Sequence, residues 1–179
     1  MGVTTSSNSA VTYTPIATQT LGSNQTSVTF NSLGSYTDIV VVCNVLATNT
    51  NCYVALRFNG DTGSHYSATA MDGTGSSAES WRTTNDTRIE ISNHANSMST
   101  TNPATVICNI QNYANTTTYK TAVCRFSAVN SGGETTATVG LWRGSTGSST
   151  DAITSITIEG LGGTFATNSV FSIYGILAA

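Results

Sequence analysis

Charge is the property that this sequence lacks most. Only 8 % of its 179 residues are Asp, Glu, Lys or Arg, whereas about a quarter of an average soluble domain is charged. The six basic residues are scattered along the chain and the net charge is −3. A nucleic-acid binder needs a basic patch that neutralises phosphates. The sequence therefore predicts no nucleic-acid partner, and its composition favours an extracellular or virion structural part over a cytosolic enzyme.

Long apolar segments are missing as well. No run approaches the ~18 consecutive apolar residues of a membrane-spanning helix, so we expect no membrane partner. The first ten residues are polar and carry neither the basic nor the apolar region of a secretion signal. The length suits one domain. We interpret residues 1–10 as a flexible N-terminal arm and residues 11–179 as a single domain.

The sequence also lacks the periodicity of an amphipathic helix. Apolar residues never keep helical spacing over ~12 residues, while β-branched residues, which favour strands, recur throughout. Turn-forming breakers such as Asn59-Gly60-Asp61 separate the apolar runs. This spacing predicts an all-β, antiparallel β-sandwich or barrel. The expected strands are 13–21, 27–31, 36–46, 52–59, 66–71, 80–84, 88–93, 105–113, 119–129, 137–142, 153–159 and 170–176.

Alternation within these strands predicts which residues share a face. In one strand Val54, Leu56 and Phe58 point one way. In another, Cys124 and its apolar neighbours oppose a face that includes Arg125. Such strands bury one face and leave the other in water or packed against a partner.

Four cysteines leave two interpretations open. Cys43 and Cys52 flank one polar turn, and Cys108 and Cys124 flank another. If both turns close symmetrical hairpins, each pair lies across a ladder and is close enough for a disulfide. The alternative, which assembly in a reducing cytoplasm favours, is four buried, reduced thiols. The spacing of the cysteines and histidines does not predict a zinc site.

The sequence predicts no catalytic residue, no cofactor and no metal ligand. The two histidines, His65 and His94, have no nucleophile motif beside them, and the acidic residues are too scattered to select a catalytic pair. Asp61 and Asp72 lie in Gly-rich turns, where we expect their carboxylates to cap the backbone. A calcium site in these turns is the alternative.

Aromatic residues are the better candidates for contact with another molecule. Trp142 lies in a strand-like segment and is expected in the core. Trp81 and Arg82 lie in a polar setting, which favours an exposed contact. With Tyr66 and His65 they form the candidate site for a protein partner or a glycan.

Segments spread over nearly the whole chain resemble a family of small β-sandwich virion structural proteins of tailed bacteriophages. The most specific is Leu-Arg-Phe-Asn-Gly-Asp at 56–61, followed by Tyr66. The weaker ones are 13–21, 30–38, 110–113, 140–142, 152–158 and 174–176. The family comprises capsid decoration or cement proteins, head fibres and tail-fibre tips. The resemblance implies a jelly-roll-like sandwich, often trimeric, that has no enzyme activity, and it transfers no catalytic residues.

The expected function is therefore that of a bacteriophage capsid decoration or cement protein. It would assemble in the host cytoplasm, bind the major capsid protein on the outer surface of the virion as a homotrimer, and order its arm, residues 1–10, against the shell. One alternative is a tail-fibre or head-fibre module that recognises host surface glycans. Another is a hydrolase of host surface polymers, which needs two acidic side chains within ~5–9.5 Å of each other.

Overall fold

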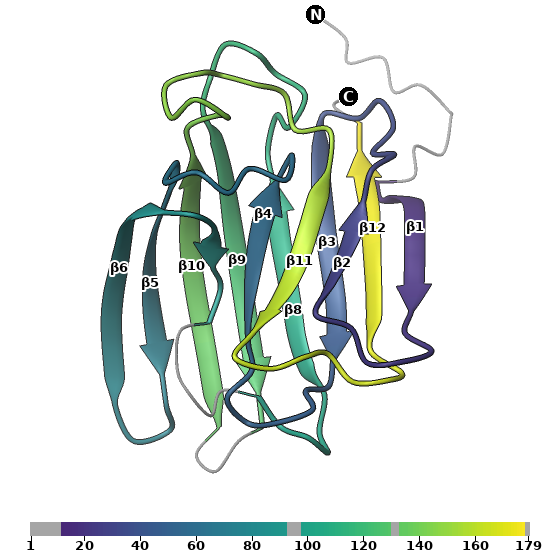
Figure 1. Ribbon diagram of the computed structural model, residues 1–179, viewed down its shortest axis with the longest axis vertical. Helices are drawn as coiled ribbons and strands as arrows, with labels where there is room; N and C mark the ends of the chain where they lie inside the picture. Colours follow the sequence, from purple (N-terminus) through teal and green to yellow (C-terminus); the bar gives the residue numbers. More distant parts are fainter. Residues whose placement is uncertain (1–11, 93–97, 130–132, 178–179) are drawn as a thin grey trace, which may run out of the picture.

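The computed structural model describes residues 12–92, 98–129 and 133–177, and it confirms the predicted antiparallel β-sandwich (Figure 1). None of the described residues is helical. The arm predicted at residues 1–10 and His94 both lie outside the described residues. The strands are β1 (Thr14–Thr20), β2 (Ser27–Phe30), β3 (Asp38–Val45), β4 (Tyr53–Phe58), β5 (Tyr66–Gly73), β6 (Ala78–Asp86), β7 (Ile89–Glu90), β8 (Ala104–Ile110), β9 (Lys120–Ala128), β10 (Glu134–Trp142), β11 (Ile156–Leu161) and β12 (Val170–Ile176).

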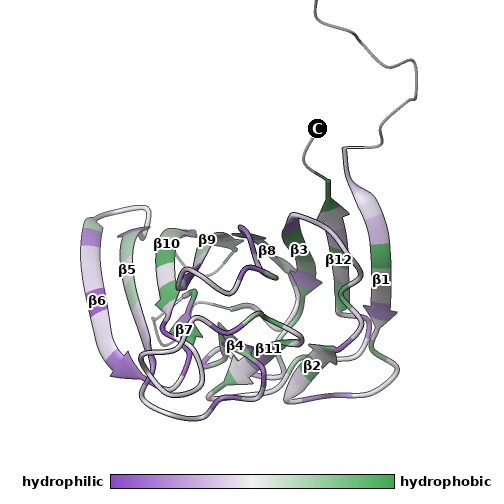
Figure 2. Cartoon of the chain, turned by 90° about the horizontal axis from the view of Figure 1, so that it is seen from above, coloured by the Kyte–Doolittle hydropathy of each residue, from purple (hydrophilic) through white to green (hydrophobic). Residues whose placement is uncertain are grey.

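Two sheets of unequal size make up the sandwich. The larger has eight strands in the order β1-β12-β3-β8-β9-β10-β5-β6, and the smaller has four in the order β2-β11-β4-β7. From β1 to β4 the chain changes sheet at every step, and it does so again from β10 to β12. This repeated exchange gives the jelly-roll-like arrangement that the resemblance implied. Figure 2 shows the larger sheet curving around the smaller one.

The core lies between the sheets because side chains alternate along each strand. In β9 the even-numbered residues from Lys120 to Ala128 are buried, while Val123, Arg125 and Ser127 point outward. In β4, Val54, Leu56 and Phe58 are fully buried, as the alternation predicted. Burying one large aliphatic or aromatic side chain contributes about 1.5–3 kcal/mol. Pairing of two apolar inner faces therefore holds the sandwich together.

The β5–β6 hairpin extends further than the sequence suggested. The loop expected from Asp72 shrinks to residues 74–77, where the N–H of Thr74 donates to the carbonyl of Ser77 at 3.0 Å. Asp72 itself belongs to β5, with its side chain buried on the inner face. The prediction that Asp72 caps a turn is therefore wrong.

Candidate functional site

A single carboxylate closes the turn after β4. Asp61 Oδ1 accepts the N–H of Gly63 at 2.9 Å, and Oδ2 accepts Trp142 Nε1–H at 2.7 Å. Oδ2 also lies 2.9 Å from His65 Nδ1. Burial opposes the charge, but these hydrogen bonds, that from Trp142 foremost, hold the pKa of Asp61 below its ordinary value. The structure thus confirms that Asp61 caps a turn.

His65, one of the predicted contact residues, belongs to the same turn. Its side chain is 23 % exposed. A Cβ atom at Gly63 would lie 2.3 Å from the ring, and one at Gly147 would lie 2.8 Å from it. The imidazole is therefore wedged between two loops and bonded to Asp61, an arrangement that fixes the loops together.

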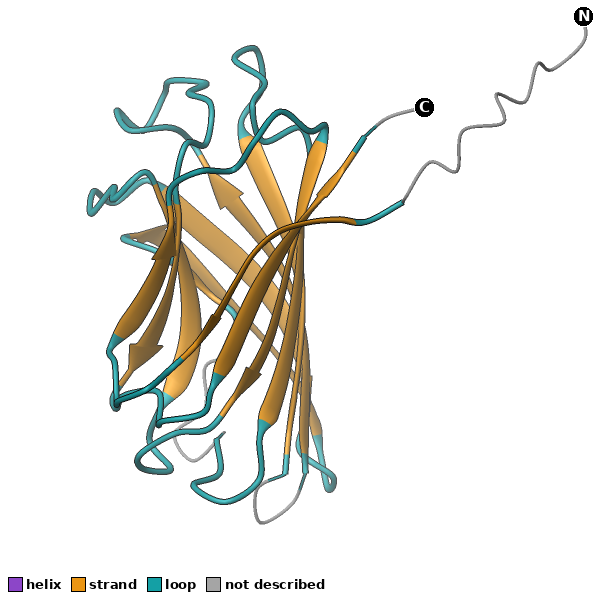
Figure 3. Cartoon of the chain, turned by 90° about the vertical axis from the view of Figure 1, so that its right-hand side faces the viewer, coloured by secondary structure: helices purple, strands orange, loops and turns teal. Residues whose placement is uncertain are grey.

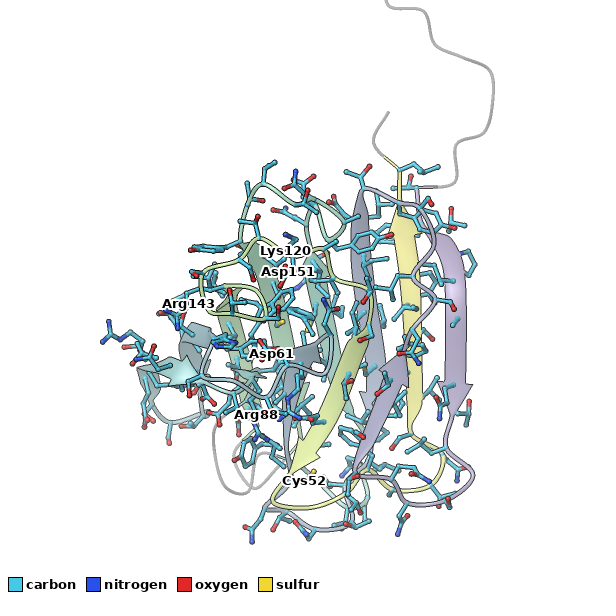
Figure 4. The ribbon with its side chains drawn as sticks, turned by 45° about the horizontal axis from the view of Figure 1, so that its top comes forward. Cys52, Asp61, Arg88, Lys120, Arg143 and Asp151 are labelled. Atoms are coloured by element: carbon cyan, nitrogen blue, oxygen red, sulfur yellow. The ribbon has the colours of Figure 1, made fainter. Side chains whose placement is uncertain are left out.

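Arg143 connects further loops by hydrogen bonds at the end of the sandwich where Asp61 and His65 lie. Its Nη2 donates to the carbonyl of Ser64 and to Oδ1 of Asn85, both at 3.0 Å. These bonds connect the end of β10 with the β4–β5 loop and with the end of β6. Figure 4 shows Arg143 at the same end of the molecule as Asp61, Lys120 and Asp151.

Asp151 orders the β10–β11 loop. Its Oδ2 accepts the N–H of Ser145 at 2.8 Å and the hydroxyls of Ser145 and Ser149 at 2.6 and 2.8 Å. The hydroxyl and N–H of Ser145 lower the pKa of Asp151. Lys120 Nζ donates to the carbonyl of Thr118 at 2.7 Å, and burial lowers the pKa of this lysine. The charged groups at this end are thus engaged in holding loops in place.

Tyr66 was predicted to be an exposed contact, and this is wrong. It is fully buried, and its ring stacks on Trp142 with centroids 6.3 Å apart. Its hydroxyl donates to the carbonyl of Phe58 and accepts the N–H of the same residue, both at 3.1 Å. The polar turn before it suggested exposure, but Tyr66 begins β5 with its side chain on the inner face. Trp142 is fully buried, as predicted.

Trp81 and Arg82 are neighbours in β6, so their side chains point to opposite faces. Trp81 points inward, is partly buried, and donates Nε1–H to Asp72 Oδ2 at 2.6 Å. Arg82 points outward and is exposed. The four predicted contact residues therefore do not form one patch.

All four cysteines are buried, and none of them is in a disulfide. Cys108 and Cys124 are directly opposite on β8 and β9, as predicted. The predicted pairing of Cys43 with Cys52 across a hairpin is wrong, because β3 and β4 lie in different sheets. Burial raises the pKa of Cys52 to about 11 and those of Cys43 and Cys108 further. The structure agrees with the interpretation of buried, reduced thiols.

Buried thiols with raised pKa values should not react with Ellman's reagent, which requires the thiolate. We expect the folded protein to show almost no reaction at pH 8. In concentrated guanidinium chloride all 4 thiols should titrate. A total of two thiols in denaturant would reveal a disulfide and contradict the arrangement described above.

Within residues 12–92, 98–129 and 133–177, no group of three or more His, Cys, Asp and Glu side chains is arranged to hold a metal ion. The described part of the chain also has no helix that is long and apolar enough to cross a membrane.

The surface of the eight-stranded sheet that points away from the four-stranded sheet, which we call the outer face, has an unusual composition. Two rows of neighbouring residues cross its middle strands, β3, β8, β9, β10 and β5. The rows are Val42-Ile107-Arg125-Ala137-Met71 and Val40-Asn109-Val123-Val139-Thr69. In these five strands the charged side chains on the outer face are Arg125 and, at the beginning of β3, Asp38.

Large aliphatic side chains are exposed in the middle of the outer face. Met71 is 67 %, Val139 53 % and Val123 41 % exposed, and Val123 lies directly opposite Val139. A sheet with one solvated face normally alternates apolar and polar residues. The described elements leave this face uncovered (Figure 3). Exposed apolar patches of this kind mark interaction sites.

Shallow hollows open on the outer face. One, of about 300 Å³, is lined by residues that include Thr69, Arg82 and Val139. Another, of about 200 Å³, surrounds Arg125 with Ile107 and Ser127. The alternation in β9 predicted a face that water or a partner covers, but the sequence did not show that five such strands adjoin. Comparisons with protein-family models, with curated proteins and with solved structures found no match to this chain.

Proposed function

We propose that this chain is a structural protein of a tailed-bacteriophage virion, and that it decorates the outer capsid as a homotrimer. The observation that carries the proposal is the outer face, an uncovered sheet surface with few charges and exposed aliphatic side chains, which suits a protein that functions as an assembly of identical copies. The jelly-roll-like sandwich and the sequence segments that resemble phage virion proteins support it further. The loops that Asp61, Arg143 and Asp151 hold together by hydrogen bonds suit a virion protein, which must keep its structure outside the cell.

The proposed role is mechanical. A decoration protein bridges neighbouring copies of the major capsid protein and so adds buried interface to the shell. An interface of about 1,200–2,000 Å² is enough for stable attachment. Contacts that depend little on charge are screened little by salt, which suits a particle released into varied media.

Recognition of glycans is supported less well. That alternative depended on an exposed aromatic cluster around Trp81 and Tyr66. Tyr66 is buried in the core, and the indole N–H of Trp81 is bonded to Asp72. The cluster therefore offers no exposed pair of rings on which a sugar could stack.

Immunogold labelling of purified virions with antibody against this chain tests the proposal. We expect gold over the whole head. Particles that lack the protein should then release DNA at a lower temperature than complete particles. Label confined to the tail, or unchanged DNA release, would contradict the decoration role.

A further inference from the structure

We infer that the outer face of the eight-stranded sheet binds a second copy of this chain, with Met71, Val123 and Val139 at the centre of the contact. The inference deepens the proposed function, on which it rests for the homo-oligomer, by naming the surface that holds the copies together. It concerns the isolated protein and can be tested without virions.

Exposed aliphatic groups supply the driving force. Met71, Val139 and Val123 are the large apolar side chains most exposed in the middle of the described strands. Transfer of apolar surface out of water is the main favourable contribution to association. These three side chains project from β5, β10 and β9, which are adjacent in the sheet. They therefore form one patch, not three isolated contacts.

The polar groups of the outer face favour another copy of this weakly charged chain over a strongly charged partner. Around the aliphatic residues lie Thr69, Thr121 and Ser127, whose hydroxyls each donate and accept hydrogen bonds. A hydroxyl-rich surface can thus form hydrogen bonds with a neighbouring copy of the chain without opposite charges. Arg125 lies beside the aliphatic patch, directly opposite Ala137 and two residues along β9 from Val123, and its guanidinium can donate to the hydroxyls of Ser127 and Thr135 in the hollow around it. Arg82 lies opposite Thr69 on the same face.

The outer face is large enough to form a stable protein–protein interface. Eight strands spaced about 4.8 Å apart and about 25 Å long cover roughly 900–1,000 Å². A stable interface of standard size buries about 800 Å² on each partner. Interfaces between identical chains are also more apolar than other protein surfaces, and of the charged residues arginine alone is enriched in them, together with methionine. Met71, Val123 and Val139 beside Arg125 and Arg82 have this composition.

The first experiment measures the mass of the purified full chain by light scattering during gel filtration. We expect a multiple of 18.5 kDa for the wild type. Val139→Glu and Met71→Glu should each weaken self-association at least about 100-fold, since each replaces an aliphatic side chain at the contact by a carboxylate that must lose its water there. Thr29→Glu is the matched control, because it places the same charge on an exposed position of β2 in the other sheet. It should leave the mass unchanged.

Methionine oxidation gives a second measurement that needs no variant at the contact. In dilute peroxide, Met71 of the wild-type oligomer should oxidise much more slowly than free methionine, whereas its exposure in a single chain would leave it reactive. Met98, which is fully buried within each chain, serves as the protected reference. Mass spectrometry of the peptides distinguishes the two sites, and the measurement decides the matter even if a glutamate variant fails to fold.

A wild-type chain that is monomeric at every concentration would overturn the inference, and so would an oligomer in which Met71 oxidises freely. Neither result bears on gold labelling of the virion head. Conversely, an oligomer that depends on Val139 and Met71, in a protein that antibody does not find on virions, would uphold this inference while contradicting the proposed function.

Discussion

Replacement of Trp142 by alanine should lower the free energy of unfolding by about 3–5 kcal/mol, the usual cost of removing a large aromatic side chain from a core. The indole is fully buried, and it contacts the rings of Phe58 and Tyr66 at centroid distances of 5.8 and 6.3 Å. Its N–H also donates to Asp61. The substitution therefore leaves a cavity and removes the leading hydrogen bond from a carboxylate that holds a turn.

Two further variants separate these contributions. Trp142→Phe keeps most of the ring packing but loses the N–H, so it should cost about 1.5–3 kcal/mol, the value of a hydrogen bond to a charged group. Trp81→Ala removes the other tryptophan, which is only partly buried on the edge strand β6, and should cost less than Trp142→Ala. Urea unfolding followed by circular dichroism at pH 7 measures all three. Equal losses for Trp81→Ala and Trp142→Ala would contradict the assignment of Trp142 as the centre of the core.

The strands could be predicted from the sequence because a strand is a local pattern. Alternation in β4 and β9 correctly identified which side chains are buried, and turn residues such as Asn59-Gly60-Asp61 marked where strands end. The carboxylate of Asp61 was correctly expected to cap its turn because such capping involves neighbours only a few residues away.

Features that depend on which strands are neighbours could not be predicted in the same way. Cys43 and Cys52 flank a turn, but that turn passes from one sheet to the other, so the two residues are not cross-strand partners. Tyr66 follows a polar turn, yet the register of β5 points it inward. The outer face emerges only when β10, with β9 on its other side, lies beside β5, a strand that ends at Gly73, far earlier in the chain than the beginning of β10 at Glu134.

Alkaline pH should unfold this protein because its thiols are buried in neutral form. The ordinary thiol pKa is 9.0, and burial raises the pKa of Cys52 to about 11. Below pH 9 both the folded and the unfolded states hold the proton, and the stabilisation is complete. Between pH 9 and 11 the unfolded thiol ionises while the folded one does not. Stability is therefore lost as the pH rises, by about 2–3 kcal/mol for Cys52 alone.

Cys43 and Cys108 add to this loss, because burial raises their pKa values further, and burial of Tyr66 raises the pKa of its hydroxyl in the same direction. The total stability of a small domain is about 5–15 kcal/mol, so three such thiols are enough to account for unfolding near pH 11.

Urea unfolding under reducing conditions at several pH values from 7 to 11 measures this loss of stability. Cys52→Ala removes the contribution of one ionising thiol. The slope of the unfolding free energy against pH should therefore fall by about 1.4 kcal/mol per pH unit. An unfolding free energy that stays constant from pH 8 to 11 would show that the buried thiols do not govern alkaline stability.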